Sequence, residues 1–143
     1  MHVDPSDSVL PATGRTYDPR TVALALKAPI KWVDNILSHN DIRGVDRTSR
    51  GVERRLSFDG VAVLAISRLL SKELGIPTPA ALKISRQLVD LGTGQVTTAG
   101  GVGVIIDWAA LIERLQGRLT EVCETSVRMR RGRQPGTGPA ADS

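Results

Sequence analysis

A proline splits residues 21–42 into two short segments with helical spacing, and this break constrains the fold more than any other feature of the sequence. Pro29 cannot continue the first helix, because it has no backbone N–H and its ring clashes with the preceding turn, but it is well placed to open a second helix. We expect apolar side chains to face inward at Val22, Leu24, Ala25, Leu26, Ile30, Val33, Ile36 or Leu37, and Ile42. Two short helices with this spacing are typical of a helix-turn-helix, whose second helix presents its outer face to a DNA groove.

The outer side of the second predicted helix carries side chains that hydrogen-bond to phosphates and base edges. We predict that this DNA-contacting set comprises Lys31, Trp32, Asn35 and Ser38, with Asp34 and His39 on the same side. An ordinary helical hairpin in a small core has the same apolar spacing, so both interpretations stay open for this stretch taken alone.

An arginine-rich stretch, residues 43–61, follows directly and is opposed by few acidic residues. Glycine, serine and threonine mark turns between two flanks, 42–45 and 52–56, that can pair as short strands. A basic hairpin beside a recognition helix is a wing, whose arginines lie along the sugar–phosphate backbone or enter the minor groove. The arginines to which we assign this role are Arg43, Arg47, Arg50, Arg54 and Arg55. A solvated hairpin with ordinary surface charge is the alternative.

Two further helices are predicted after the wing, over 57–74 and 78–91, and both mainly supply core. Ser57 is a favoured cap for the first, and Gly75 is a favoured residue just past its end. Thr78 and Pro79 are suited to begin the second helix, which ends before Gly92.

The order helix, turn, helix, basic wing and long helix resembles the DNA-binding domain of the mercury-resistance regulator (MerR) family of winged-helix transcription factors. The resemblance covers roughly residues 18–91 and is carried by Arg54-Arg55-Leu56-Ser57-Phe58-Asp59 and by Leu74-Gly75-Ile76. It implies a winged helix-turn-helix that binds duplex DNA, with subunits that pair through a C-terminal helix. One departure is that the recognition helix reads KWVDNILSH, with Asp34 where the family often has a basic residue, so no base preference is implied.

The C-terminal part is predicted to hold a β-hairpin and one helix. Residues 92–107 alternate in the manner of a hairpin with a turn at Gly100-Gly101, and a phosphate-binding loop is rejected because no Lys-Ser/Thr follows the glycines. A helix beginning at Asp107 carries a narrow apolar seam at Trp108, Ile112, Leu115, Leu119 and Val122. We assign this seam to homodimer formation; packing of the helix on its own chain is the alternative.

Composition bounds the function. The chain has 143 residues, a hydrophobic content of 41%, and 19 Lys+Arg against 15 Asp+Glu, a mildly basic balance that suits nucleic acid. The single cysteine, Cys123, excludes an internal disulfide and a multi-cysteine metal site, and His2 and His39 lack an obvious carboxylate pair. We therefore expect no enzyme, no metal and no cofactor. With no membrane-length apolar run and no signal peptide, we expect a soluble cytoplasmic protein.

Together these patterns predict a mainly α protein: a winged helix-turn-helix domain with a basic β-wing, followed by a β-hairpin and a C-terminal helix. The expected units are a flexible N-terminal arm (1–16), the DNA-binding domain (17–91), a part for dimerisation or partner binding (92–127) and a disordered basic tail (128–143). The expected function is sequence-specific regulation of transcription on double-stranded DNA by a homodimer. The alternative is an antitoxin-like protein that neutralises a partner protein through its C-terminal half and autoregulates its promoter.

Overall fold

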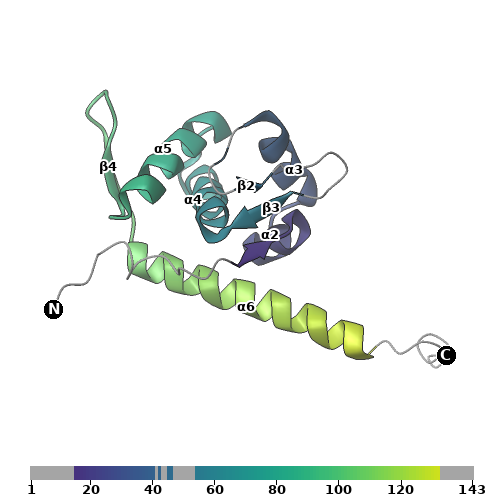
Figure 1. The fold of residues 1–143 in the computed structure, drawn as a ribbon. Helices are drawn as coiled ribbons and strands as arrows, with labels where there is room; N and C mark the ends of the chain where they lie inside the picture. The colour runs from purple at the N-terminus through teal and green to yellow at the C-terminus, as the bar shows by residue number, and fades with distance from the viewer. Residues whose placement is uncertain (1–14, 41, 43–44, 47–53, 133–143) are drawn as a thin grey trace.

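A computed structural model describes residues 15–40, 42, 45–46 and 54–132, with backbone alone at 45–46 and 126–132 (Figure 1). These residues form a mainly helical fold with two small antiparallel sheets, as expected. In chain order the elements are β1 (Thr16–Tyr17), α2 (Pro19–Leu26), α3 (Ile30–His39), β2 (Val45–Asp46), β3 (Arg55–Ser57), α4 (Phe58–Leu74), α5 (Thr78–Leu91), β4 (Gln95–Thr97), β5 (Gly103–Ile105) and α6 (Trp108–Gly132).

The predicted break between two short helices is confirmed. Asp18 caps α2 by accepting a hydrogen bond from the Thr21 N–H at 2.7 Å. The helix ends at Lys27, which is in the left-handed region with φ 55° and donates its N–H to the last turn. Pro29 then precedes the first turn of α3 in an extended conformation. The turn thus depends on the left-handed backbone of Lys27 and on Pro29, two residues later.

Two of the predicted inward positions were wrong. Leu24 is 59% exposed and Ile30 is 40% exposed, whereas Ala23 is buried. On a helix of 3.6 residues per turn, Leu24 lies about 200° around the axis from buried Val22 and so points away from the core. Ile30 lies on the same face as Val33 and Leu37, but it is the first residue of α3, at the end of the helix. Val33, Ile36 and Leu37 of α3 are buried, as predicted.

The first sheet has the order β1-β3-β2, with both neighbours antiparallel to β3. Val45 pairs with Leu56 and Asp46 with Arg55, which confirms the predicted hairpin next to α3. The third strand was not predicted, because residue 16 was assigned to a flexible arm. Thr16 instead pairs with Ser57, so the chain before α2 is held against the hairpin.

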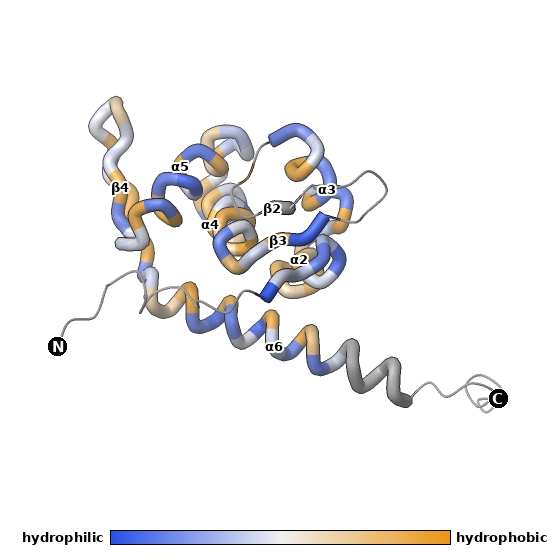
Figure 2. The backbone as a smooth tube through the Cα atoms, in the orientation of Figure 1, coloured by the Kyte–Doolittle hydropathy of each residue, from blue (hydrophilic) through white to orange (hydrophobic). Residues whose placement is uncertain are grey.

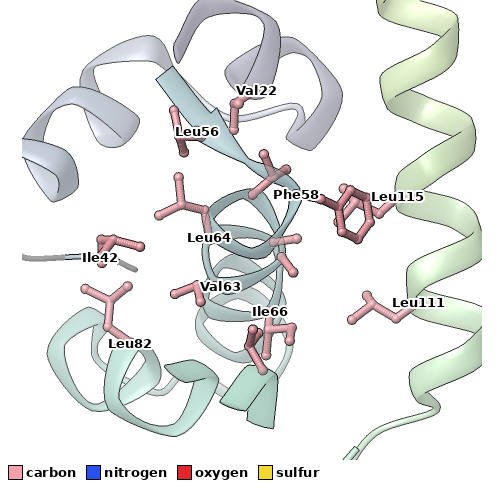
Figure 3. Close-up of a cluster of buried hydrophobic side chains, with 14 of the residues drawn as sticks. Val22, Ile42, Leu56, Phe58, Val63, Leu64, Ile66, Leu82, Leu111 and Leu115 are labelled. Atoms are coloured by element: carbon pink, nitrogen blue, oxygen red, sulfur yellow. The ribbon is translucent and has the colours of Figure 1, made fainter. Parts of the chain in front are cut away.

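Helix α4 lies at the centre of the fold, and Figure 2 shows hydrophobic segments in and around it. Every residue from Gly60 to Ser67 is buried, which is expected only of a helix enclosed on all sides. Figure 3 shows Val63 and Leu64 on the side of Ile42 and Leu82. This enclosure makes α4 the element on which α2, α5 and α6 all pack.

The predicted second hairpin is confirmed, since β4 and β5 pair antiparallel with Val96 opposite Val104. It projects from the body of the fold near the end of α5 (Figure 1). Gly94 has φ 77° and permits close approach to the next helix, because a Cβ there would meet Trp108 Cβ at 2.9 Å. Asp107, at which the helix was predicted to begin, caps α6 by accepting a hydrogen bond from the Ala110 N–H at 3.2 Å.

The α6 seam, which the sequence assigned to a dimer contact, packs against its own chain. Four side chains of the predicted set, Trp108, Ile112, Leu115 and Leu119, are at most 7% exposed, and Val122 packs against the same core. Figure 3 shows Phe58 of α4 directed toward α6 at Leu115. The seam is therefore covered by its own chain, which was the alternative that its spacing left open.

The hydrophobic core also crosses the boundary predicted at residue 91. One cluster of buried side chains runs from Val22 in α2 through α4 to Leu119 in α6. Helix α6 continues to Gly132 and so extends past residue 127, where the sequence predicted a disordered tail to begin (Figure 1). Residues 133–143 and 1–14 lie outside the described residues.

Candidate nucleic-acid interface

The outer face of α3 presents three of the predicted DNA-contacting side chains. Lys31, Asn35 and Ser38 are exposed at positions i, i+4 and i+7, and therefore share one face of the helix. The opposite face packs into the core through Val33 and Leu37, both fully buried. The helix is thus held from behind and offers a polar row of two turns in front.

Trp32 occupies a different position from the other members of the predicted set. It is half-buried, packs against the core, and carries the guanidinium of Arg68 from α4 over its ring, 5.2 Å from the centroid. Stacking of this kind is favourable because the ring face is electron-rich. Trp32 therefore lies at the edge of the exposed face and joins α3 to α4.

Two further polar side chains flank the exposed row. Asp34 is exposed and adds a negative charge three residues after Lys31. His39, also exposed, donates from Nδ1 to the carbonyl of Asn35 at 2.9 Å. The face is consequently of mixed charge, and Asp34 weakens its attraction for phosphate.

Only part of the predicted wing falls within the described residues. Arg43, Arg47 and Arg50 lie outside them, whereas Arg54 is half-buried and Arg55 is exposed. Arg55 donates from Nε to Thr16 Oγ1 and from Nη2 to the Thr16 carbonyl, both at 3.0 Å. Arg55 therefore holds β1 against β3, a role that was not predicted. Nη1 of Arg55 takes no part in these two hydrogen bonds.

Electrostatic effects are clearest near the start of α2. Burial raises the pKa of the Asp18 carboxyl, but hydrogen bonds from Thr21 and the charges of Arg55 and Arg20 outweigh it, so the net pKa lies below the usual value. Burial raises the pKa of the Tyr17 hydroxyl, against the opposing charge of Arg15. A charged Asp18 therefore stabilises the first turn of α2.

The described part of the chain also contains residue types that can bind a metal ion or react as a thiol. Among these residues, no three histidine, cysteine, aspartate or glutamate side chains gather where a metal ion would bind. Cys123 is a half-buried free thiol on α6. None of the helices described is both long and apolar enough to cross a membrane.

Comparison with known proteins adds no relative. No family model matches the sequence, no curated protein is significantly similar to it, and no solved structure matches significantly. The MerR-like resemblance therefore remains a prediction that rests on the quoted residues, and function is inferred from the geometry of the chain itself.

Two contacts near the candidate interface were not predicted from the sequence. Arg68 of α4 stacks on Trp32 of α3, and Thr16 of β1 accepts a hydrogen bond from Arg55. The helix that carries Arg68 was predicted mainly to supply core, and Thr16 was assigned to a flexible arm. No local pattern in the sequence marks either contact, because each joins segments that are far apart along the chain.

Proposed function

We propose that this protein binds duplex DNA through a winged helix-turn-helix and regulates transcription, in the manner of the MerR family that its sequence resembles. The observation that carries the proposal is the polar row Lys31, Asn35 and Ser38, exposed on the helix that directly precedes the arginine-rich hairpin. The sheet order β1-β3-β2 supports it, because it anchors that hairpin beside the two helices.

The dimensions of α3 suit a major groove. Its 10 residues span about 15 Å, and the groove of B-DNA, roughly 12 Å wide, admits one α-helix. Asn35 is of the residue type that bonds adenine through two hydrogen bonds, and Lys31 of a type that bonds guanine or phosphate. Asp34 lowers the non-specific part of the affinity, so the arginines of the wing supply most of the phosphate contact in this proposal.

Homodimer formation remains part of the proposal, since two copies would set two recognition helices against a palindromic site. The seam first assigned to it is covered within the protomer. The dimer contact must therefore come from another surface than Trp108, Ile112, Leu115 and Leu119.

The proposal is tested by DNA binding of the full chain. The probe is a duplex covering the promoter of the protein's own gene, titrated by fluorescence anisotropy at several salt concentrations. We expect K31A/N35A to weaken binding about 10- to 100-fold, and R54A to reduce the salt slope by about 1. The matched control is K83A/Q87A on α5. It also removes an exposed lysine and an exposed amide at positions i and i+4, and differs only in that glutamine is one methylene longer than asparagine. Equal loss in both double variants would contradict the assignment to α3.

A second candidate, the antitoxin-like binding of a partner protein, is favoured by one observation. The projecting hairpin exposes Val102 by 62% and Ile105 by 75%. Exposed apolar side chains that gather on one element mark interaction surfaces. Co-purification with the product of the adjacent gene, lost in V102S/I105S and retained in L74S, would support this function; retention in all three would exclude the hairpin.

A further inference from the structure

A groove with a volume of about 560 Å³ lies where the C-terminal end of α2 meets α4 and α6. Its apolar lining comes from all three helices: Ala25, Leu26, Ala65, Leu69, Leu111 and Leu115. The volume falls within the range of small-molecule sites, about 300–1,000 Å³. The groove is separate from the exposed row of α3.

The charges that line the groove are almost all of one sign. Among the described lining residues, Glu73 is the acidic one, and the basic ones are Lys27, Arg68, Lys72, Arg114 and Arg118. Lys27, Lys72 and Arg114 are exposed, so their charges face the solvent-filled side of the groove. The groove therefore combines an apolar lining with a positive rim.

The carbonyl end of α2 does not oppose an anion here. The Lys27 backbone N–H covers the carbonyls of Ala23 and Leu24, and Arg118 Nη1 donates to the carbonyl of Ala25 at 2.9 Å. Arg68 adds a guanidinium whose Nε is buried and has no hydrogen-bond partner among the described residues. The carbonyls of Ala23, Leu24 and Ala25 thus have donors within the chain, and the exposed cations Lys72 and Arg114 remain for a ligand.

We propose that this groove binds a small anionic amphiphile, a carboxylate joined to an unbranched hydrocarbon chain. The chain lies along the apolar lining, and the carboxylate lies at the rim near Lys72 and Arg114. Complementarity of charge selects an anion, and the apolar lining selects a chain over a bare ion. An uncharged or cationic amphiphile leaves the rim unpaired or repelled.

The test is isothermal titration of the full chain with sodium dodecanoate below its micelle-forming concentration. We expect a Kd on the order of 10 µM, which corresponds to a strength typical of modest small ligands. Octanoate should bind at least about tenfold more weakly, because four methylenes are lost from an apolar site. Acetate, which has the charge alone, and dodecyltrimethylammonium, which has the chain with the opposite charge, should not bind.

Two matched variants locate the site. K72E/R114E reverses two exposed cations of the rim, whereas R20E/K83E reverses two exposed cations elsewhere and changes the net charge equally. We expect the first to abolish dodecanoate binding and the second to retain it within about twofold. Urea midpoints equal to that of the wild type in both variants show that folding is unchanged.

Trp32 provides a second readout, because its ring contacts Arg68, which lines the groove. Dodecanoate should change tryptophan fluorescence in the wild type and not in W32F, in which Trp108 alone remains, while the titration heat persists. A lack of heat with dodecanoate up to its solubility limit would overturn the proposal. So would equal loss in both charge variants, or a sedimentation dimer that K72E/R114E dissociates, which would show a second copy in the groove.

A regulatory consequence rests on the proposed function. The groove contacts α2, and Arg68 contacts α3, so a bound ligand lies against the helices proposed to read DNA. Saturating dodecanoate should change the DNA Kd at least fivefold in the wild type and leave it unchanged in K72E/R114E. An unchanged wild-type Kd would overturn this coupling; failure to bind any DNA would overturn the proposed function, and the titration with dodecanoate is independent of both.

Discussion

Arg118 of α6 donates a hydrogen bond from Nη1 to the backbone carbonyl of Ala25 in the last turn of α2, at 2.9 Å and across 93 positions of sequence. A cation at this place both satisfies a carbonyl that the helix leaves open and complements the negative end of the helix dipole. The bond connects the C-terminal helix to the helical pair that forms the candidate interface.

Replacement of Arg118 should therefore destabilise the whole fold. We expect R118A to lower the free energy of unfolding by roughly 1–2 kcal/mol, because a half-buried, charge-assisted hydrogen bond is lost. Urea unfolding followed by circular dichroism measures the change. R114A, which removes an exposed cation one turn earlier in the same helix, should stay within about 0.5 kcal/mol of the wild type. Similar losses in the two variants would argue against a specific role of the bond.

Lys27 should be a site of stored backbone strain. It is the non-glycine residue with positive φ among the described residues, and left-handed backbone costs an L-residue about 1 kcal/mol. We expect K27G to raise the unfolding free energy by up to about 1 kcal/mol. The same change in the middle of a helix, K83G in α5, should lower it by about 1 kcal/mol. A loss of stability in K27G would show that its side chain contributes more than the strain costs.

Much of the local structure was predictable because it depends on residues with narrow backbone preferences. Pro29 separates α2 from α3, and Gly75 and Gly92 end α4 and α5 in the left-handed conformation. The exposed side of α3 also followed from its apolar spacing, which buries Val33 and Leu37. These features need only the few residues around them.

The remaining features depend on contacts between distant segments. Strand β1 has two residues, too few to show alternation, and forms because Arg55 and β3 lie beside it. The seam of α6 has the same spacing whether its partner is a second chain or the chain itself, and Phe58 and the rest of the core decide the choice. The contact of Arg68 with Trp32 likewise joins two helices that no local pattern relates.

Stability should depend on pH through Asp18. Its native pKa lies below the ordinary aspartate value of 3.8, so the charged carboxylate stabilises the fold above about pH 4. This contribution is lost as the pH falls through the native pKa. D18A should cost about 1 kcal/mol at pH 7, whereas D18N, which also caps a helix, should cost only a few tenths there. Unfolding curves from pH 7 to pH 2.5 should show a smaller loss of stability in D18N than in the wild type; parallel curves would contradict this role.

The buried serine pair between α4 and α5 should be energetically unequal. Ser67 Oγ donates to Ser85 Oγ at 2.9 Å, and Ser85 Oγ in turn donates to the Ala81 carbonyl at 2.7 Å. Both side chains are fully buried. S85A removes the acceptor of Ser67 and should cost about 1–2 kcal/mol, because a buried donor is left unsatisfied. S67A leaves the bond from Ser85 to Ala81 intact and should cost less.

The double variant separates this explanation from simple loss of packing. Once Ser85 is replaced, removing the stranded hydroxyl of Ser67 should restore part of the stability, so S67A/S85A should be no less stable than S85A alone. Thermal and urea unfolding of the three variants give the coupling free energy. If the two single losses simply add, the hydrogen bond between α4 and α5 contributes little, and the cost of each change lies in the space that its oxygen fills.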